Sequence, residues 1–343
     1  MKKLLNVLYV TMPEAYLGLD GETVVIRKDD TIVMRLPLHN LENIVCFSYL
    51  GASPALMGAC AERNIGLCFL APSGRFLGRI SGKVRGNVLL RKEQYRVSED
   101  AAKNAGIAVS FLIGKLTNCR KVIDRAVRDH ELLLDGVKLR QASASLKNLA
   151  QTVRGCQSVE EMIGVEGSAA RVYFGVFDQL ILQQRVDFQF NERSRRPPLD
   201  NINAMLSFFY TILANEAVNA LEAVGLDPYV GFLHQDRPGR PSLALDLMEE
   251  LRPVFADRFV LSLINRKQVN GEGFTQKESG AVLMDDATRK KALSAWQDRK
   301  KEMILHPFLK EKIEFGLIPY VQALLLARHL RGDLDAYPPF FWN

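Results

Sequence analysis

Long apolar runs are absent from this sequence. No stretch reaches the roughly eighteen consecutive apolar residues that a membrane-spanning helix requires. Residues 1–21, MKKLLNVLYVTMPEAYLGLDG, are interrupted by charge, proline and glycine too early for a signal peptide or a membrane anchor. We therefore expect a soluble, cytoplasmic protein with no membrane partner.

Cysteine and histidine are scarce as well. The five cysteines form an odd number without a Cys-x-x-Cys pair, which argues against a disulfide framework and against a zinc knuckle. A formal net charge of +6 favours an anionic partner, but over 343 residues this excess is informative only where basic residues cluster near a site. With five histidines in the chain, a histidine beside carboxylates is the feature of most interest.

The first part of the chain consists of short apolar runs at close spacing. Between Leu4 and about Gly82 these runs show period-two alternation and many β-branched residues, which predicts a sheet-rich fold. The predicted strands are residues 4–10, 15–21, 22–30, 31–37, 42–50, 65–71 and 74–80. An Ala-rich segment at residues 53–64 predicts one short helix. No group of polar side chains suited to catalysis emerges here, so this half is expected to be a structural or dimerising module.

The chain changes character after about Gly86. Apolar residues then recur at spacings of three and four, which is typical of long helices. The predicted helices are residues 98–130, 136–155, 158–181, 200–225, 241–266 and 317–333, and a small hairpin is expected at residues 274–284. The sequence therefore predicts an α+β fold, with a β-sheet domain in residues 1–86 followed by a larger all-α domain in residues 87–343.

One of these helices carries the strongest candidate chemistry. Residues 231–253 read GFLHQDRPGRPSLALDLMEELRP, and the helix is expected to begin near Pro241, because proline is tolerated in a first turn. Asp246 and Glu249 then share one face of the helix. The turn before it lets the His234 imidazole approach the start of the same helix. Two carboxylates and an imidazole suit Mg²⁺ or Mn²⁺ and are compatible with zinc.

A further ligand is expected from the segment MIGVEGSAARVYFG. Glu166 lies there between Gly164 and Gly167, among apolar and small residues. A glycine inside a helix costs about 1 kcal/mol relative to alanine, so two of them indicate that this backbone packs closely against another element. A carboxylate at such a contact would be half-buried and would attract a cation.

Each candidate ligand also has a plainer explanation. His234 could be a core or capping residue, and Glu249 and Glu250 could form a solvated face. Glu166 could pair with Arg171 or face water. Spacing alone leaves these alternatives open.

Basic residues flank the candidate site. Residues 190–200, FNERSRRPPLD, are expected to form a mobile basic loop, because they contain paired prolines and little that could enter a core. Arginines beside a divalent metal are suited to a phosphodiester substrate, since they neutralise its phosphates. The arginines expected to contact DNA are Arg193, Arg195, Arg196, Arg237 and Arg240.

Four segments in a fixed order resemble a known family. GVEGSAARVYF, NAMLSFFY, GLDPYVGFLH and GRPSLALDLMEELRP lie between residues 164 and 253 and resemble motifs of the CRISPR-associated adaptation integrases, the universal spacer-acquisition nucleases. The earlier segments LGLDGETVVI and PLHNLENIVCF are similar to the β-domain of that family. The resemblance therefore extends over nearly the whole chain.

The resemblance implies a metal site for Mg²⁺ or Mn²⁺. In this family the ligands are the glutamate of a Glu-Gly-x-Ala-Ala-Arg helix, the histidine that ends Gly-Phe-x-His, and an acidic residue on the following helix. These positions match Glu166, His234 and Glu249 here. Many relatives have aspartate at the third position, so the third ligand stays open between Glu249, Glu250 and Asp246, and Asp246 is also a candidate to support a ligand from behind.

The resemblance also implies a function. In the family reaction, the 3′-hydroxyl of a captured DNA fragment, the protospacer, attacks a phosphodiester at the repeat of a CRISPR array. Residues 1–86 would then form the dimerisation domain of a homodimer, and residues 87–343 the catalytic domain. Two dimers would join a small second adaptation protein in a heterohexamer. Two alternatives stay open: a stand-alone nuclease that repairs branched DNA, and a non-catalytic DNA-binding subunit.

Overall fold

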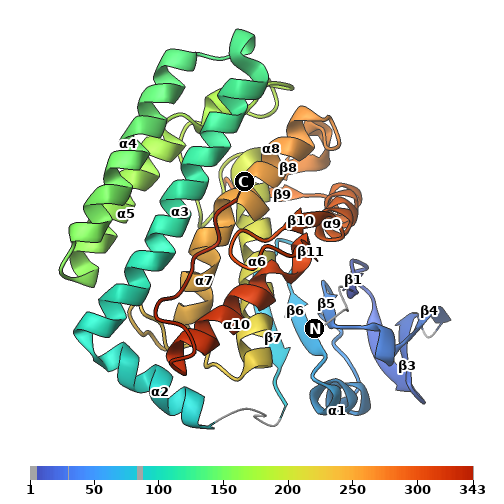
Figure 1. Ribbon diagram of the computed structural model, residues 1–343. Helices are drawn as coiled ribbons and strands as arrows, with labels where there is room; N and C mark the ends of the chain where they lie inside the picture. The colour runs from blue at the N-terminus through green and yellow to red at the C-terminus, as the bar shows by residue number, and fades with distance from the viewer. Residues whose placement is uncertain (1–5, 30, 83–87, 343) are drawn as a thin grey trace.

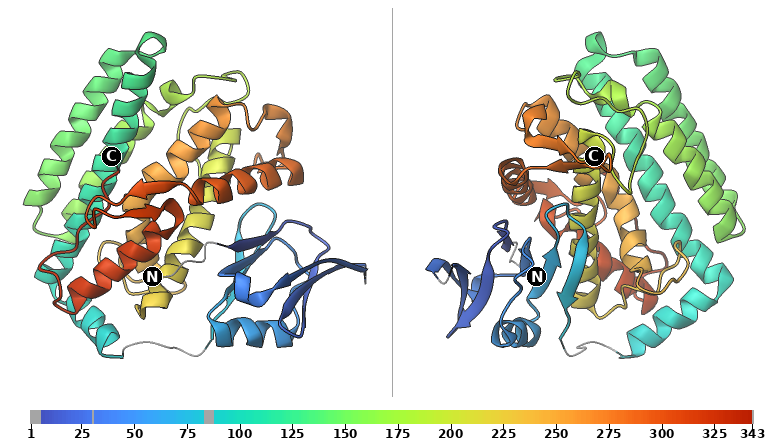
Figure 2. Two further views of the ribbon diagram at one scale, coloured as in Figure 1. Left: turned by 45° about the vertical axis from the view of Figure 1, so that its right-hand side comes forward. Right: turned by 180° about the vertical axis from the view of Figure 1, so that it is seen from behind.

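The protein is described by a computed structural model that covers residues 6–29, 31–82 and 88–342. Strands occupy the first part of the chain and helices dominate the second, which confirms the predicted α+β fold (Figure 1). The N-terminal strands form a lobe beside the helices in both views of Figure 2. The predicted boundary between residues 86 and 87 lies outside the described residues. No helix in the described ranges is both long and apolar enough to cross a membrane.

The N-terminal lobe contains two sheets. The antiparallel sheet has the strand order β2 (Tyr16–Asp20), β3 (Thr23–Lys28), β4 (Thr31–Pro37). The second sheet has the order β1 (Val7–Val10), β5 (Asn43–Cys46), β6 (Gly66–Leu70), β7 (Phe76–Ile80), in which only β7 pairs in the antiparallel sense. Each strand coincides with a predicted apolar run. Side chains of both sheets, such as Leu17, Ile26, Ile44 and Leu67, share one core.

The predicted short helix is α1 (Pro54–Arg63), which connects β5 to β6. A crossover of this kind is required because β5 and β6 are parallel. Ser53 caps the helix by accepting a hydrogen bond from the Leu56 N–H group over 3.2 Å. The helix ends where Asn64 adopts a left-handed conformation with a φ of 54°.

The second lobe consists of long helices with two short hairpins. The helices are α2 (Val88–Glu99), α3 (Ala101–His130), α4 (Gly136–Gly155), α5 (Val159–Phe174), α6 (Asn201–Val224), α7 (Ser242–Arg252), α8 (Arg258–Asn265), α9 (Asp286–Lys300) and α10 (Ile318–Leu330). The hairpins are β8 (Phe274–Gln276) with β9 (Val282–Met284), and β10 (Met303–Leu305) with β11 (Lys312–Glu314). The first hairpin was predicted, whereas the second hairpin and α2 were not. The lobe is therefore mostly helical, with two short hairpins, and not purely all-α.

Helix α6 lies at the centre of the second lobe and packs against α7 and α10. Asp200 caps its start and Gly225, with a φ of 88°, ends it, which agrees with the helix predicted at residues 200–225. Helix α7 continues through a π-helical turn (Pro253–Asp257) into α8, so residues 242–265 form one helical stretch. A π-helical turn inside a helix often accompanies a functional site.

Candidate metal centre

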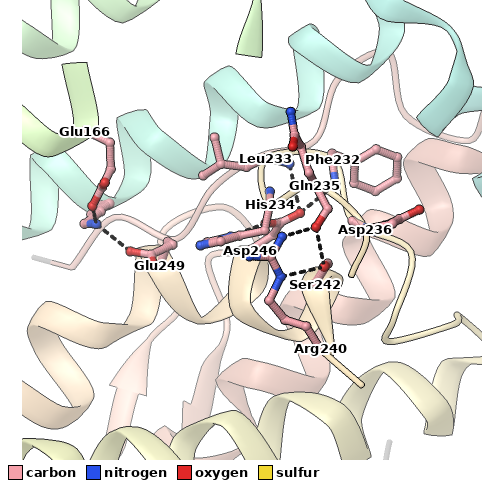
Figure 3. A network of polar contacts seen from close by, with 12 residues as sticks. Glu166, Phe232, Leu233, His234, Gln235, Asp236, Arg240, Ser242, Asp246 and Glu249 are labelled. Atoms are coloured by element: carbon pink, nitrogen blue, oxygen red, sulfur yellow. Dashed lines mark hydrogen bonds and ion pairs between the residues drawn. The ribbon is translucent and has the colours of Figure 1, made fainter. Parts of the chain in front are cut away.

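Three helices bring one lysine and two glutamates together. Lys115 on α3 donates a hydrogen bond to Glu166 Oε1 on α5, and its Nζ atom lies 2.6 Å from Oε2 of Glu249 on α7. The side chains of Lys115 and Glu249 are buried, whereas 29% of the Glu166 side chain is exposed. This lysine cluster, formed by Lys115, Glu166 and Glu249, therefore opens to solvent on the Glu166 side. In Figure 3, Glu249 lies between Glu166 and His234.

Two cations balance the charge of the buried glutamate. Burial raises the pKa of Glu249, but Arg252 and Lys115 outweigh burial and hold that pKa at about 2. Arg252 donates a hydrogen bond of 2.6 Å to Glu249 Oε1. Burial lowers the pKa of Lys115, but the neighbouring glutamates, Glu249 first, leave it above its usual value. Both members of the Lys115–Glu249 pair are therefore ionised at neutral pH.

His234 is held in place by Asp246. The Nδ1 atom of His234 lies 2.7 Å from Asp246 Oδ1 (Figure 3). The N–H groups of Phe232, Leu233 and His234 donate to the same carboxylate over 2.6, 3.0 and 2.9 Å. Burial lowers the pKa of His234, but the hydrogen bond and the charge of Asp246 outweigh burial and raise the pKa above its usual value. Because Nδ1 faces Asp246, Nε2 points away from that carboxylate.

The turn before α7 requires glycine at position 231. A Cβ atom at Gly231 would lie 2.8 Å from both Asp246 Oδ2 and Ser242 Cβ. Glycine therefore lets this part of the backbone lie directly against α7. Arg240 helps to close the same turn, because its guanidinium donates to the Gln235 carbonyl and to Ser242 Oγ.

The three carboxylates of α7 have different surroundings. Glu250 is fully buried and accepts hydrogen bonds from the Tyr337 hydroxyl and from the Gln322 amide. Burial raises the pKa of Glu250 to about 7. Because its hydrogen-bond partners include Tyr337, this side chain helps to pack the C-terminal segment against α7. Both oxygens of Asp246 already accept hydrogen bonds, from the backbone N–H groups of residues 232–234 and from Nδ1 of His234. Glu249 is the acidic residue of α7 that takes part in the lysine cluster.

A glycine on α3 explains why Lys115 reaches α7. A Cβ atom at Gly114 would lie 2.8 Å from Glu250 Cβ, so only glycine allows α3 and α7 this close an approach. The glycines of α5 have no such role. A Cβ atom at Gly164 or Gly167 would meet no atom within 4 Å. The prediction that these glycines let the helix pack closely against another element is therefore wrong.

Arg193 packs inside the protein. Its guanidinium donates hydrogen bonds to Asn203 and Ser207 over 2.6 and 3.0 Å, and lies over the Tyr210 ring at 5.1 Å from the centroid. Arg252 lies over the same ring at 4.6 Å. The expectation that residues 190–200 contain little that could enter a core is therefore wrong for Arg193, because α6 offers it polar partners and an aromatic face. The other predicted loop arginines are exposed, namely Arg195, Arg196 and Arg237.

The lysine cluster has the chemistry of a divalent-cation site. In the described part of the chain, no three His, Cys, Asp or Glu side chains lie close enough together to hold a metal ion as they stand. The Lys115 ammonium, however, lies where one cation contacts both carboxylates. Despite that contact, the buried Glu249 Oε2 accepts no hydrogen bond of good geometry. The two carboxylates therefore fit a divalent cation, provided that Lys115 moves aside.

Lys115 was missing from the residues predicted for this site. It is the one charged residue between Lys103 and Arg120, within the apolar segment IAVSFLIGKLTNC. A lone charge in an apolar helix indicates a buried partner. That signal was available in the sequence, but it does not say which carboxylate the lysine meets.

The chain matches one protein family over most of its length. The family profile described as CRISPR associated protein Cas1 matches residues 8–298. A protein of Rhodospirillum rubrum named CRISPR-associated endonuclease Cas1 2 is 51% identical over 347 residues, which cover 100% of both chains.

Two solved structures share the fold. A casposase bound to an integration product has a TM-score of 0.85 at 21% identity, and the match covers 99% of this chain and 95% of that chain. A Cas6-RT-Cas1–Cas2 complex contains a chain with a TM-score of 0.82 at 22% identity, and the match covers 100% of this chain and 36% of that chain. The profile and the full-length identity show that this chain belongs to the Cas1 family and is a CRISPR-associated endonuclease that integrates spacers.

Proposed function

We propose that Glu166, Glu249 and Nε2 of His234 bind one divalent cation, Mg²⁺ or Mn²⁺, in this Cas1 endonuclease. The convergence of both glutamates on one ammonium group supports this set of ligands, because carboxylate oxygens are the donors that these ions prefer. Asp246 would fix the tautomer in which Nε2 of His234 is free to coordinate. Lys115 would hold the two carboxylates together in the metal-free protein.

The reaction we propose joins a protospacer to a CRISPR repeat. The 3′-hydroxyl oxygen of the protospacer forms a bond to a phosphorus atom of the repeat, and the bond from that phosphorus to the repeat 3′-oxygen breaks. A bound divalent cation stabilises negative charge on the reacting phosphate. Lys115, once displaced from between the carboxylates, would place a second positive charge close to the same phosphate.

The N-terminal lobe would serve as the dimerisation domain of a homodimer, and the helical lobe as the catalytic domain. Strand β4 lies at the edge of its sheet and exposes Ile32, Val33 and Met34 at 40%, 46% and 47%. An exposed apolar edge strand is a natural pairing surface. The Cas2 in the Cas6-RT-Cas1–Cas2 complex supports Cas2 as the small second protein, and two homodimers joined by it would form the heterohexamer on DNA.

A strand-transfer assay tests the metal ligands. Purified protein, with and without Cas2, is mixed with a fragment carrying free 3′-hydroxyls and a supercoiled repeat plasmid, in Mg²⁺, Mn²⁺ or EDTA. Glu166→Gln and His234→Ala should abolish covalent joining, while the exposed Glu131→Gln serves as the control. Normal joining by Glu166→Gln would refute the ligand assignment. Metal-dependent cutting without joining would favour the branched-DNA nuclease, and binding alone the non-catalytic subunit.

A further inference from the structure

A cavity of about 390 Å³ lies between α8 and α9, away from the lysine cluster. Basic and polar side chains dominate its wall: Arg258, Ser262, Arg266, Gln268, Lys291 and Arg299. Two carboxylates also reach the wall, but Glu302 pairs with Arg299 over 2.5 Å and Asp298 approaches Lys301 at 3.6 Å. The cavity therefore carries an excess of positive charge.

Two of these arginines lack an acidic partner. Throughout the described ranges, no carboxylate lies within ion-pairing distance of Arg258 or Arg266. Burial lowers the pKa of Arg258 to about 10, and the nearby charges of Arg299 and Arg125 act in the same direction. A partly buried charge is normally paired, because its desolvation costs free energy that only an opposite charge offsets. Glu302 acts on Arg258 only from a distance because it pairs with Arg299, and Arg266 is exposed, so both arginines are free to pair with an anion from outside the chain.

The C-terminal segment fixes Arg258 in this position. Its guanidinium lies 4.5 Å from the centroid of the Trp342 ring, and that of Arg125 lies 5.1 Å from the same centroid. The Trp342 N–H group donates to Asn118 on α3 over 2.9 Å, which ties the tryptophan to the helix bundle. A second cavity of about 430 Å³ is lined by Arg125, Arg258 and Arg266, and also by Asp129, which pairs with Arg125 over 3.2 Å. The arginines are thus preorganised around adjoining cavities before any ligand arrives.

We propose that Arg258 and Arg266 form an anion site that binds a backbone phosphate of the DNA substrate. Arginine guanidinium groups match phosphate oxygens in geometry and in charge. Arg258 follows Glu249 by nine residues along one continuous helical stretch, which corresponds to about 14 Å at the rise of a helix. That distance is about four base-pair steps of a duplex. The site would anchor the DNA at a phosphate several steps away from the reacting phosphodiester.

The identification of the anion as DNA rests on the proposed function, whereas the anion site itself does not. DNA binding is therefore measured in EDTA, by fluorescence anisotropy of a labelled single-stranded oligonucleotide at several salt concentrations. Arg258→Gln/Arg266→Gln should weaken binding about tenfold and reduce the slope of log K against log salt by about 0.7, since the site binds one phosphate and each phosphate contact contributes about 0.7 on a single strand. The loss should be the same for different base sequences.

A matched control removes the same charge elsewhere. Arg96→Gln/Arg140→Gln takes two exposed, ion-paired arginines from α2 and α4 and should leave the affinity unchanged. Because Arg258 also stacks on Trp342, the single variant Arg266→Gln tests the site without that contact and should lose about half of the salt effect.

Three outcomes separate the possibilities. If the double variant binds DNA with the affinity and salt slope of the control, the proposal is wrong. If inorganic phosphate raises the melting temperature of the wild type but not of the double variant, while DNA affinity is unchanged, the site binds free phosphate and the DNA assignment fails. In a third outcome, neither the wild type nor the variants join DNA in the strand-transfer assay with Mg²⁺ or Mn²⁺, yet the double variant loses affinity for the oligonucleotide. The anion site is then supported, and the proposed chemistry at the metal centre is wrong.

Discussion

The Lys115 ammonium lies 2.6 Å from the Glu249 carboxylate and also donates to Glu166, so one internal cation bridges glutamates from two different helices. Two carboxylates this close would repel each other without it. The arrangement would link stability to the proposed function, because the pair would have to stay ionised and close together in order to bind the divalent ion that we propose. On that proposal, lysine and metal compete for one place.

Lys115→Met should reveal this competition. Removal of one partner of a buried ion pair leaves Glu249 with Arg252 alone, and we expect the metal-free protein to lose about 3 kcal/mol of unfolding free energy. Mn²⁺ should then stabilise the variant more than the wild type, since the ion restores the missing charge. Thermal unfolding with Mn²⁺ or EDTA measures both effects. Lys103→Met, an exposed change on the same helix, is the control, and equal stability of Lys115→Met and wild type in EDTA would contradict the expectation.

Glu249 and Glu250 are neighbours with opposite expected behaviour. Glu249→Gln should remove Mn²⁺ binding, measured by electron paramagnetic resonance of free Mn²⁺, because the amide is a weak ligand that carries no charge. Glu250→Gln should keep Mn²⁺ binding but lose about 2 kcal/mol of stability, because the amide nitrogen that replaces one carboxylate oxygen cannot accept the hydrogen bond that Tyr337 or Phe340 donates there. The reverse pattern would make Glu250 the third ligand.

Asp246→Asn should chiefly change the pKa of His234. The neutral amide removes the charge that raises the pKa of His234 and leaves burial, which lowers it, so the imidazole pKa should fall. NMR titration of the His234 ring in EDTA reports this shift directly. Metal affinity should also drop by about 10- to 100-fold, as is usual when the partner of a metal-binding histidine is lost. An unchanged His234 pKa would show that Asp246 does not control the ring.

The sequence predicted strands and helices well where local chemistry decides them. Period-two runs gave the N-terminal strands, and Asp200 and Gly225 delimit α6 as expected. Glu166, Glu249 and His234 were predicted as ligands from spacing and motif, and the structure brings the two glutamates together on Lys115. What could not be predicted depends on contacts between distant helices. Gly114 matters because α7 passes over it, and Glu250 differs from Glu249 because the C-terminal segment folds back onto one side of α7.

Asp257 gives the protein a pH-dependent stability that can be tested apart from the metal centre. Burial raises the pKa of Asp257 to about 6, although its carboxylate accepts a hydrogen bond of 2.5 Å from the Tyr210 hydroxyl. An unfolded aspartate has a pKa near 3.9. Between those values the unfolded chain releases a proton that the native protein keeps, so the free energy of unfolding falls as pH rises from about 4 to about 6 and then stays at the lower level.

Asp257→Asn removes that proton equilibrium. The stability of the variant relative to wild type should therefore increase by about 3 kcal/mol between pH 4 and pH 7, the equivalent of two pKa units. Urea unfolding at a series of pH values measures this difference, and contributions from groups such as Glu250 cancel because both proteins contain them. A constant difference across the range would mean that Asp257 has the same pKa folded and unfolded. It would then be ionised in the native protein, with the charges of Arg252 and Arg193 offsetting its burial.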